Sequence, residues 1–97
     1  MQRLLLERRI SDVHRRLVRA REELAVIDEQ LGVVTDAAEE ARLRSLVSET
    51  PLAAREHGEA QRHADVLTRA REALASTVAD LERRRDELLA HVGTGSR

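Results

Sequence analysis

Apolar residues recur at alternating steps of four and three along the first half of the chain. This spacing places their side chains on one stripe of an α-helix that faces a partner helix, as in a coiled coil. The stripe is expected to continue through Ala38 and Ala41, with Leu43, Leu46 and Val47 carrying it to residue 48. Its strong part consists of Leu6, Ile10, Val13, Leu17, Ala20, Leu24, Ile27, Leu31 and Val34.

The second half carries a matching stripe. Two consecutive steps of four, from Ala70 through Leu74 to Val78, predict a stutter that locally relaxes the supercoil. Arg85 is the one charged residue on this stripe, and its aliphatic stem is expected to lie along apolar neighbours with the guanidinium in water. The other members are Ala60, His63, Leu67, Leu81, Leu88 and Val92.

The only proline, Pro51, stands near the middle of the chain, directly after Ser48-Glu49-Thr50. Thr50 precedes proline, which disfavours helical dihedral angles, and its side chain suits a helix cap. Pro51 suits the first helical position, where no amide donor is needed. The predicted arms, about 4–48 and 51–92, are nearly equal at about 65 Å each.

The two helical arms predict an all-α fold. Because the arms are equally long, they are expected to form a long antiparallel coiled-coil helical hairpin. The pairs expected to lie opposite one another are Leu17 and Leu81, Leu24 and Leu74, and Leu31 and Leu67. A break at Gly32 is the alternative, because Asp36 and Glu39 resemble a capping box that would start a third helix. The segment 36–48 has few large apolar residues, so the hairpin is preferred, with a kink at Gly32 allowed. Residues 93–97 are expected to form a flexible tail.

Composition supports helix and excludes several kinds of chemistry. The chain has no aromatic residue and no cysteine, and 36% of its residues are charged. Scarce aromatic residues disfavour a sheet protein, and the lack of cysteine excludes disulfides, thiolate metal sites and thiol nucleophiles. Only three consecutive apolar residues precede Glu7, too few for a signal peptide or a membrane span. A soluble cytoplasmic protein without a membrane partner is therefore expected.

No motif for catalysis, cofactor binding or metal binding stands out. The chain lacks a glycine-rich phosphate loop and a clustered Ser, His and acid pattern, so no enzyme activity is expected. Glu59 and His63, like Glu87 and His91, are four residues apart, but the two pairs are too distant to complete one metal site.

Charge is unevenly distributed along the chain. Residues 1–21 hold seven Arg against two acids, whereas residues 22–60 hold three Arg against ten acids. Arg8, Arg15 and Arg19 fall along one helix face, which is expected to be solvated or to form salt bridges between subunits. Binding of nucleic-acid phosphates by this face is a disfavoured alternative, and single strands lack an aromatic platform for stacking. The candidate protein-binding residues are Arg8, Arg15, Arg19, Glu49, Arg83, Arg84 and Arg85.

A two-helix hairpin buries one stripe of each arm, and a small chain without disulfide or metal usually needs further burial. Apolar residues off the main stripe predict a second face for another copy or for a partner protein. The expected function is therefore a non-enzymatic protein–protein interaction module, an adaptor or regulator that forms a homodimer and binds an unidentified protein. The off-stripe residues are Leu5, Val18, Ala25, Val26, Val66, Ala73 and Leu89.

A coiled-coil hairpin with carboxylates near its tip resembles the hairpins of Gre-type and DksA-type factors, which reach into the secondary channel of bacterial RNA polymerase. The resemblance is architectural, and Glu49 is the only acid in the turn itself. Its alternative implication is a transcription regulator that binds RNA polymerase through an acidic tip. The nearby acids are Glu39, Glu40, Glu56 and Glu59.

Overall fold

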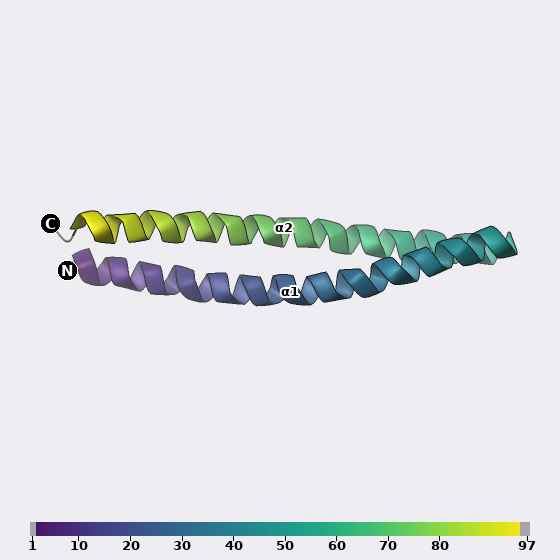
Figure 1. Cartoon of the computed structure of the whole chain (residues 1–97), viewed down its shortest axis with the longest axis horizontal. Coiled ribbons are helices and arrows are strands. Elements are labelled where there is room, and N and C mark those ends of the chain that lie inside the picture. The colour runs from purple at the N-terminus through teal and green to yellow at the C-terminus, as the bar shows by residue number, and fades with distance from the viewer. Residues whose placement is uncertain (1, 96–97) are drawn as a thin grey trace. The chain divides into compact units, whose positions relative to one another are not determined.

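Two α-helices make up the computed structural model, which describes residues 2–95. Helix α1 spans Gln2–Ser48, helix α2 spans Pro51–Gly95, and Glu49 and Thr50 join them (Figure 1). No strand occurs between residues 2 and 95. The helices run in opposite directions and pack against each other, so the predicted all-α antiparallel hairpin is confirmed.

Helix α1 continues through Gly32 without a break, so the three-helix alternative is wrong. Gly32 is exposed, and a Cβ atom placed on it would meet nothing within 4 Å. Its cost in a helix is about 1 kcal/mol relative to alanine. The partly buried neighbours Leu31 and Val34 keep both sides of this position in the helix pairing, which outweighs that cost.

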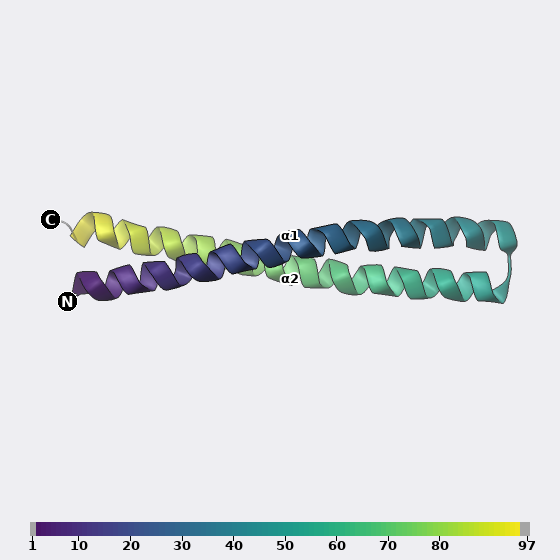
Figure 2. The same cartoon turned by 90° about the horizontal axis from the view of Figure 1, so that it is seen from below.

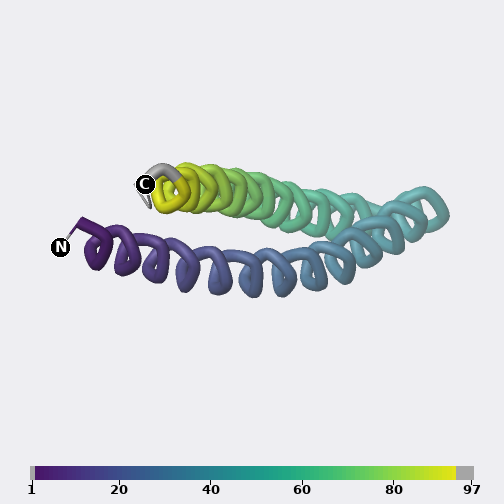
Figure 3. Tube along the Cα trace, turned by 60° about the vertical axis from the view of Figure 1, so that its left-hand side comes forward, coloured from purple at the N-terminus to yellow at the C-terminus, as the bar shows by residue number. Residues whose placement is uncertain are grey.

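The hairpin divides into two compact units. Unit 1 combines Met1–Leu24 with Leu74–Arg97, the purple and yellow parts of Figure 3. Unit 2 is Ala25–Ala73 and contains the turn, which Figure 2 shows as the connection between α1 and α2. Each unit therefore pairs a segment of α1 with a segment of α2.

The core of unit 1 is a cluster of buried apolar side chains, Leu17, Ala20 and Val78. Leu17 is completely buried, with 0% exposure. Partly buried leucines from both helices pack against this cluster, namely Leu24, Leu74 and Leu81. These contacts confirm that the leucine-rich parts of the two predicted stripes face each other in unit 1.

The stripe on α2 differs from the predicted one at two positions. His63 and Ala70 are exposed, whereas Ala64 is buried and Arg71 is partly buried. With these two residues the steps alternate between four and three throughout α2, so the predicted stutter is wrong. Arg71 suits the stripe because its stem is apolar and its guanidinium reaches Asp28 on α1. The corrected stripe is Ala53, His57, Ala60, Ala64, Leu67, Arg71, Leu74, Val78, Leu81, Arg85, Leu88 and Val92.

Near the turn, the expectation that Leu43, Leu46 and Val47 extend the stripe on α1 is wrong, because all three are exposed. The stripe continues instead from Ala38 and Ala41 to Ser45, which keeps the alternating step. Small side chains face this segment from α2, and they include Ala53, Ala60 and Ala64. Opposed stripe residues are equally far from Glu49, as Ser45 and Ala53 illustrate.

The turn follows the predicted chemistry and adds one unusual backbone conformation. Glu49 has a φ of 50°, in the left-handed region, and its N–H donates to the Ser45 carbonyl oxygen at 3.1 Å. This is the bond that closes a left-handed C-terminal cap. The Thr50 hydroxyl accepts from the Ala53 N–H at 3.1 Å, so Thr50 caps α2 and Pro51 takes its first position.

Helix α2 reaches Gly95, three residues beyond the predicted helix end at residue 92. The rest of the predicted flexible tail, residues 96–97, lies outside the described residues. Across residues 2–95, neither helix contains a stretch of the length and apolar character that crossing a bilayer requires.

Candidate protein-binding surfaces

The seven predicted protein-binding residues do not form one site. Arg8, Arg15 and Arg19 belong to the α1 segment of unit 1, and Arg83, Arg84 and Arg85 to its α2 segment. Glu49 lies in the turn, in unit 2.

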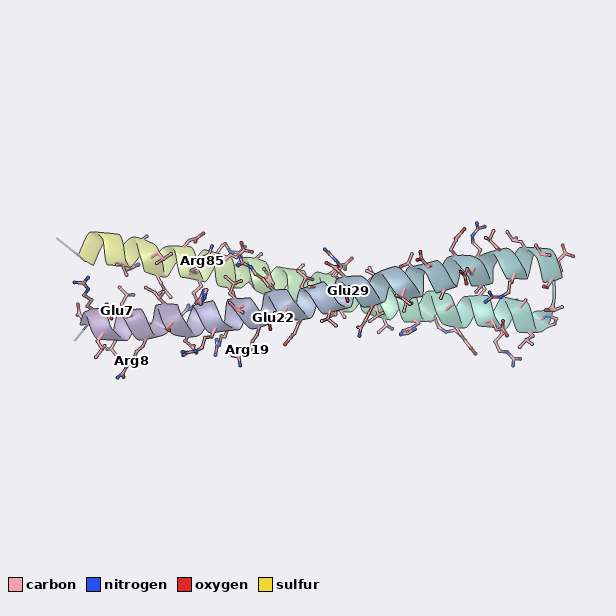
Figure 4. All side chains as sticks on the ribbon, turned by 60° about the horizontal axis from the view of Figure 1, so that its bottom comes forward. Glu7, Arg8, Arg19, Glu22, Glu29 and Arg85 are labelled. Atoms are coloured by element: carbon pink, nitrogen blue, oxygen red, sulfur yellow. The ribbon has the colours of Figure 1, made fainter. Side chains whose placement is uncertain are left out.

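The three arginines of α1 form an exposed basic face. Figure 4 shows Arg8 and Arg19 pointing away from α2. Arg8, Arg15 and Arg19 are exposed and have no ion-pair partner among the described residues, whereas the neighbouring Arg16 lies 3.7 Å from an Asp12 oxygen. This face is therefore available to an anionic partner.

The arginines of α2 are less available. Arg83 pairs with Asp80 on the same helix. Arg85 donates to Asp86 Oδ1 from Nε at 3.3 Å and from Nη2 at 3.2 Å, and its side chain is only 28% exposed. The predicted placement of its stem along the stripe agrees with this burial. Of the three, only Arg84 is exposed without an ion-pair partner among the described residues.

Each unit has an ion pair between α1 and α2. In unit 1, Arg21 Nη2 lies 3.6 Å from Glu82 Oε2. In unit 2, Arg71 reaches from the stripe of α2 to Asp28, which follows Leu24 by four residues. We call the side of unit 2 that carries Asp28 the paired flank, and Thr35, seven residues after Asp28, also lies on it.

Glu39 and Arg42 form a bidentate pair on α1 in unit 2, with distances of 2.7 and 3.1 Å. The hydrogen bonds from Arg42 hold the pKa of the Glu39 carboxyl below its usual value, and the positive charge of Arg42 lowers it further. The pKa of Arg42 is raised by the same hydrogen bonds. This acid is therefore already occupied within the chain.

The other side of the helix pair in unit 2 carries exposed apolar residues. Each residue turns an α-helix by about 100°, so residues two and four positions after Leu24 or Leu31, the stripe positions that a step of three follows, lie on opposite sides of the stripe. Asp28 follows Leu24 by four, whereas Val26 follows it by two. We call the apolar residues of this side the open flank of unit 2, and its members are Val26, Val33, Ala37, Val66, Ala70 and Ala73. The polar Gln30 and His63, seven residues before Ala37 and Ala70, lie on the same side.

The valines of the open flank are well exposed to solvent. Val33 is 71% exposed, Val66 is 59% exposed and Val26 is 53% exposed. No ion pair joins α1 to α2 across this flank among the described residues. Two stripes of small apolar residues, one on each helix, are therefore open to solvent side by side.

A second exposed apolar group surrounds the turn in unit 2. Val47 is 86% exposed, and Leu43, Leu46 and Leu52 are also exposed. We call these four residues the tip cluster. The acid of the turn, Glu49, is exposed beside them.

Sequence reasoning missed most of this group because it placed Leu43, Leu46 and Val47 on the stripe. Ala41 follows Ala38 by three residues and Ser45 follows Ala41 by four, so continuing the alternating steps would have placed Ser45 on the stripe and excluded these three residues. Val33 was missed as an off-stripe residue, although it follows Val26 by seven.

Comparison with known protein families, curated proteins and solved structures finds no match. Within the described part of the chain, His, Asp and Glu do not gather in threes as metal ligands would. The two exposed apolar surfaces and the arginine face are thus the features from which a function is argued.

Proposed function

We propose that this chain is a non-enzymatic protein–protein interaction module, an adaptor or regulator that binds a partner protein and a second copy of itself by helix packing. The observation that carries the proposal is the amount of surface left exposed. The chain exposes 7400 Å², whereas a compact monomer of 10.9 kDa exposes about 5600 Å². The difference of about 1800 Å² is about twice the surface that one partner buries in a standard protein–protein interface.

The tip cluster is the surface proposed for the partner protein. Complete burial of one Val or Leu side chain stabilises a complex by about 1.5–3 kcal/mol, so four such residues can anchor a partner. Acids border the cluster, because Glu49 lies in the turn and Glu56 follows Leu52 by four residues. The partner is therefore expected to present an apolar groove with basic side chains at its rim.

Self-association is proposed for the open flank, which lies on a different part of unit 2. A helix pair with two apolar stripes per helix buries the second stripe by forming a four-helix bundle. Such a dimer supplies the burial that a small chain without disulfides lacks.

One alternative has a specific observation in its favour. Arg8, Arg15 and Arg19 are exposed without ion-pair partners among the described residues, as phosphate-binding residues are. Binding of duplex nucleic acid by this face predicts an affinity that is strongest at low salt. The RNA polymerase alternative has less support, since Glu39 pairs with Arg42 and apolar residues dominate the tip.

The test is affinity capture from the native host with three forms of the chain. The wild type and a control variant, Thr35→Asp on the paired flank, are expected to retain the same partner protein. Leu46→Asp combined with Val47→Asp is expected to lose it, while circular dichroism shows unchanged helix content. A partner that binds all three forms equally, or no partner at all, would contradict the tip as a docking site.

A further inference from the structure

We infer that a second copy of this chain docks on the open flank of unit 2, with α1 of each copy facing α2 of the other. This inference rests on the proposed self-association and adds to it a face, an orientation and the residues that set the orientation.

The open flank has the size and spacing that a second helix interface needs. Val26 and Val33 are seven residues apart on α1, as are Val66 and Ala73 on α2, so each helix presents a second heptad stripe. The apolar members of the flank are Val or Ala, small side chains that suit an approach of helix axes to about 8–10 Å, and the polar Gln30 and His63 lie on the same side. The stripe ends towards the turn at Glu40 and Glu59, which border the interface.

The edges of the open flank carry opposite charges on the two helices. Next to the valines of α1 stand two acids, Glu29 and Asp36, and Figure 4 labels the first of them. Next to Val66 on α2 stand two bases, Arg62 and Arg69. Within each helix these residues are seven apart, so each edge has a single sign of charge.

This sorting of charge distinguishes the two ways in which identical flanks can pack. A two-fold axis along the helices places α1 of one copy on α2 of the other, so that acidic edges meet basic edges. A two-fold axis across the helices places α1 on α1 and α2 on α2, so that like charges meet. Because like-charge contacts are disfavoured and a two-fold interface must match itself, the first arrangement is selected.

The register of the charges agrees with the first arrangement. An axis along the helices keeps every residue at its own distance from the turn in both copies. Glu29 and Arg69 are equally far from Glu49 along the chain, and so are Asp36 and Arg62. The acids of one copy therefore come level with the arginines of the other. Exposed pairs add little affinity, so their role is to select the orientation, while the valines provide the burial.

Charge reversal tests this pairing. The variant Glu29→Arg/Asp36→Arg makes both edges basic, and the variant Arg62→Glu/Arg69→Glu makes both acidic. Sedimentation equilibrium is expected to show dimers of wild type, dissociation constants at least about tenfold weaker for either variant alone, and a restored dimer in their equimolar mixture. Dissociation constants for the separate variants equal to that of wild type would overturn the inference.

Cross-linking tests the orientation, and the chain has no native cysteine to interfere. Chains with Val33→Cys are mixed with chains with Val66→Cys and treated with a short bismaleimide. Links between the two kinds of chain are expected to dominate, because Val33 of α1 lies near Val66 of the other copy's α2. Links mainly between identical chains would indicate the other two-fold axis. Thr35→Cys on the paired flank is the control and should give few links.

The outcomes separate this inference from the proposal on which it rests. If Val33→Asp dimerises as tightly as wild type, self-association stands and the open flank is the wrong face. If wild type is a monomer at the highest measurable concentration, self-association and this inference both fail. Circular dichroism of each variant shows whether a lost dimer reflects the interface or an unfolded chain.

Discussion

Replacing Leu17 by alanine is the most direct test of the helix pairing. Leu17 is fully buried and belongs to the cluster with Ala20 and Val78 in unit 1. The substitution removes three carbon atoms, which lowers the free energy of unfolding by about 2.4 kcal/mol through lost transfer alone. A residual cavity increases the loss, but the partly buried Leu81 and Leu74 can move to fill part of it. We therefore expect a loss of about 3 kcal/mol.

This loss is large for a small protein, whose total stability is about 5–15 kcal/mol. The melting temperature of Leu17→Ala should fall by at least about 10 °C. Urea unfolding followed by circular dichroism measures the free energy, and Leu5→Ala is the matched control because Leu5 lies exposed on the same segment of α1. The control should stay within about 0.5 kcal/mol of wild type. Equal losses for the two variants, measured at two protein concentrations, would refute the pairing of α1 with α2.

Three further predictions concern single positions of unit 2. Glu49→Gly should raise the free energy of unfolding by about 0.5–1 kcal/mol in urea titrations, because glycine adopts a positive φ without strain. Arg42→Ala should raise the pKa of Glu39 towards its usual value in an NMR titration, because the hydrogen bonds that lower this pKa are lost. A carboxyl whose pKa is lowered by folding stabilises the fold at pH values above its unfolded-state pKa. This stabilisation is lost as the pH falls through the folded-state pKa, so any contribution of Glu39 should disappear only in acid. Arg71→Leu should raise the free energy of unfolding in urea titrations by about 1 kcal/mol, because leucine suits a stripe position and the exposed pair with Asp28 contributes little.

Each of these predictions has an outcome that contradicts it. Glu59→Gly is the control for the turn and should lower stability by about 1 kcal/mol, since this residue is inside α2. A loss of stability in Glu49→Gly would mean that the left-handed turn does not persist in solution. An unchanged pKa of Glu39 in Arg42→Ala would argue against their pairing. Destabilisation by Arg71→Leu would show that the bridge to Asp28 contributes more than apolar burial.

The helices, the turn and the facing leucines were predictable from local chemistry. Thr50 and Pro51 specify the start of α2, and the steps from Leu6 to Val34 specify the face of α1 that meets α2. These signals depend only on neighbouring residues. Because the two helices have nearly equal length, the position of the turn then determines which residues of α1 face which residues of α2.

The details near the turn and along α2 were not predictable from hydrophobicity alone. His63 and Ala70 were placed on the stripe instead of Ala64 and Arg71, and at the second of these positions hydrophobicity favours alanine over arginine. Its stem can nevertheless occupy a stripe position when an acid such as Asp28 receives the guanidinium. The candidate binding surfaces were more difficult to predict from the sequence. Leu43, Leu46 and Val47 of the tip cluster are apolar, and they were therefore assigned to the interface between the helices.

Stripe residues that face each other across the two helices are equally far from Glu49. This pairing limits how the length of the chain can change. Deleting one residue from either helix would rotate everything beyond it by about 100° and carry its stripe away from the neighbouring helix. Adding or removing seven residues in both helices, at equal distances from Glu49, keeps each stripe facing the other helix and keeps the facing residues paired. Homologues of different size are therefore expected to differ by such paired blocks, with the two-residue connection left intact.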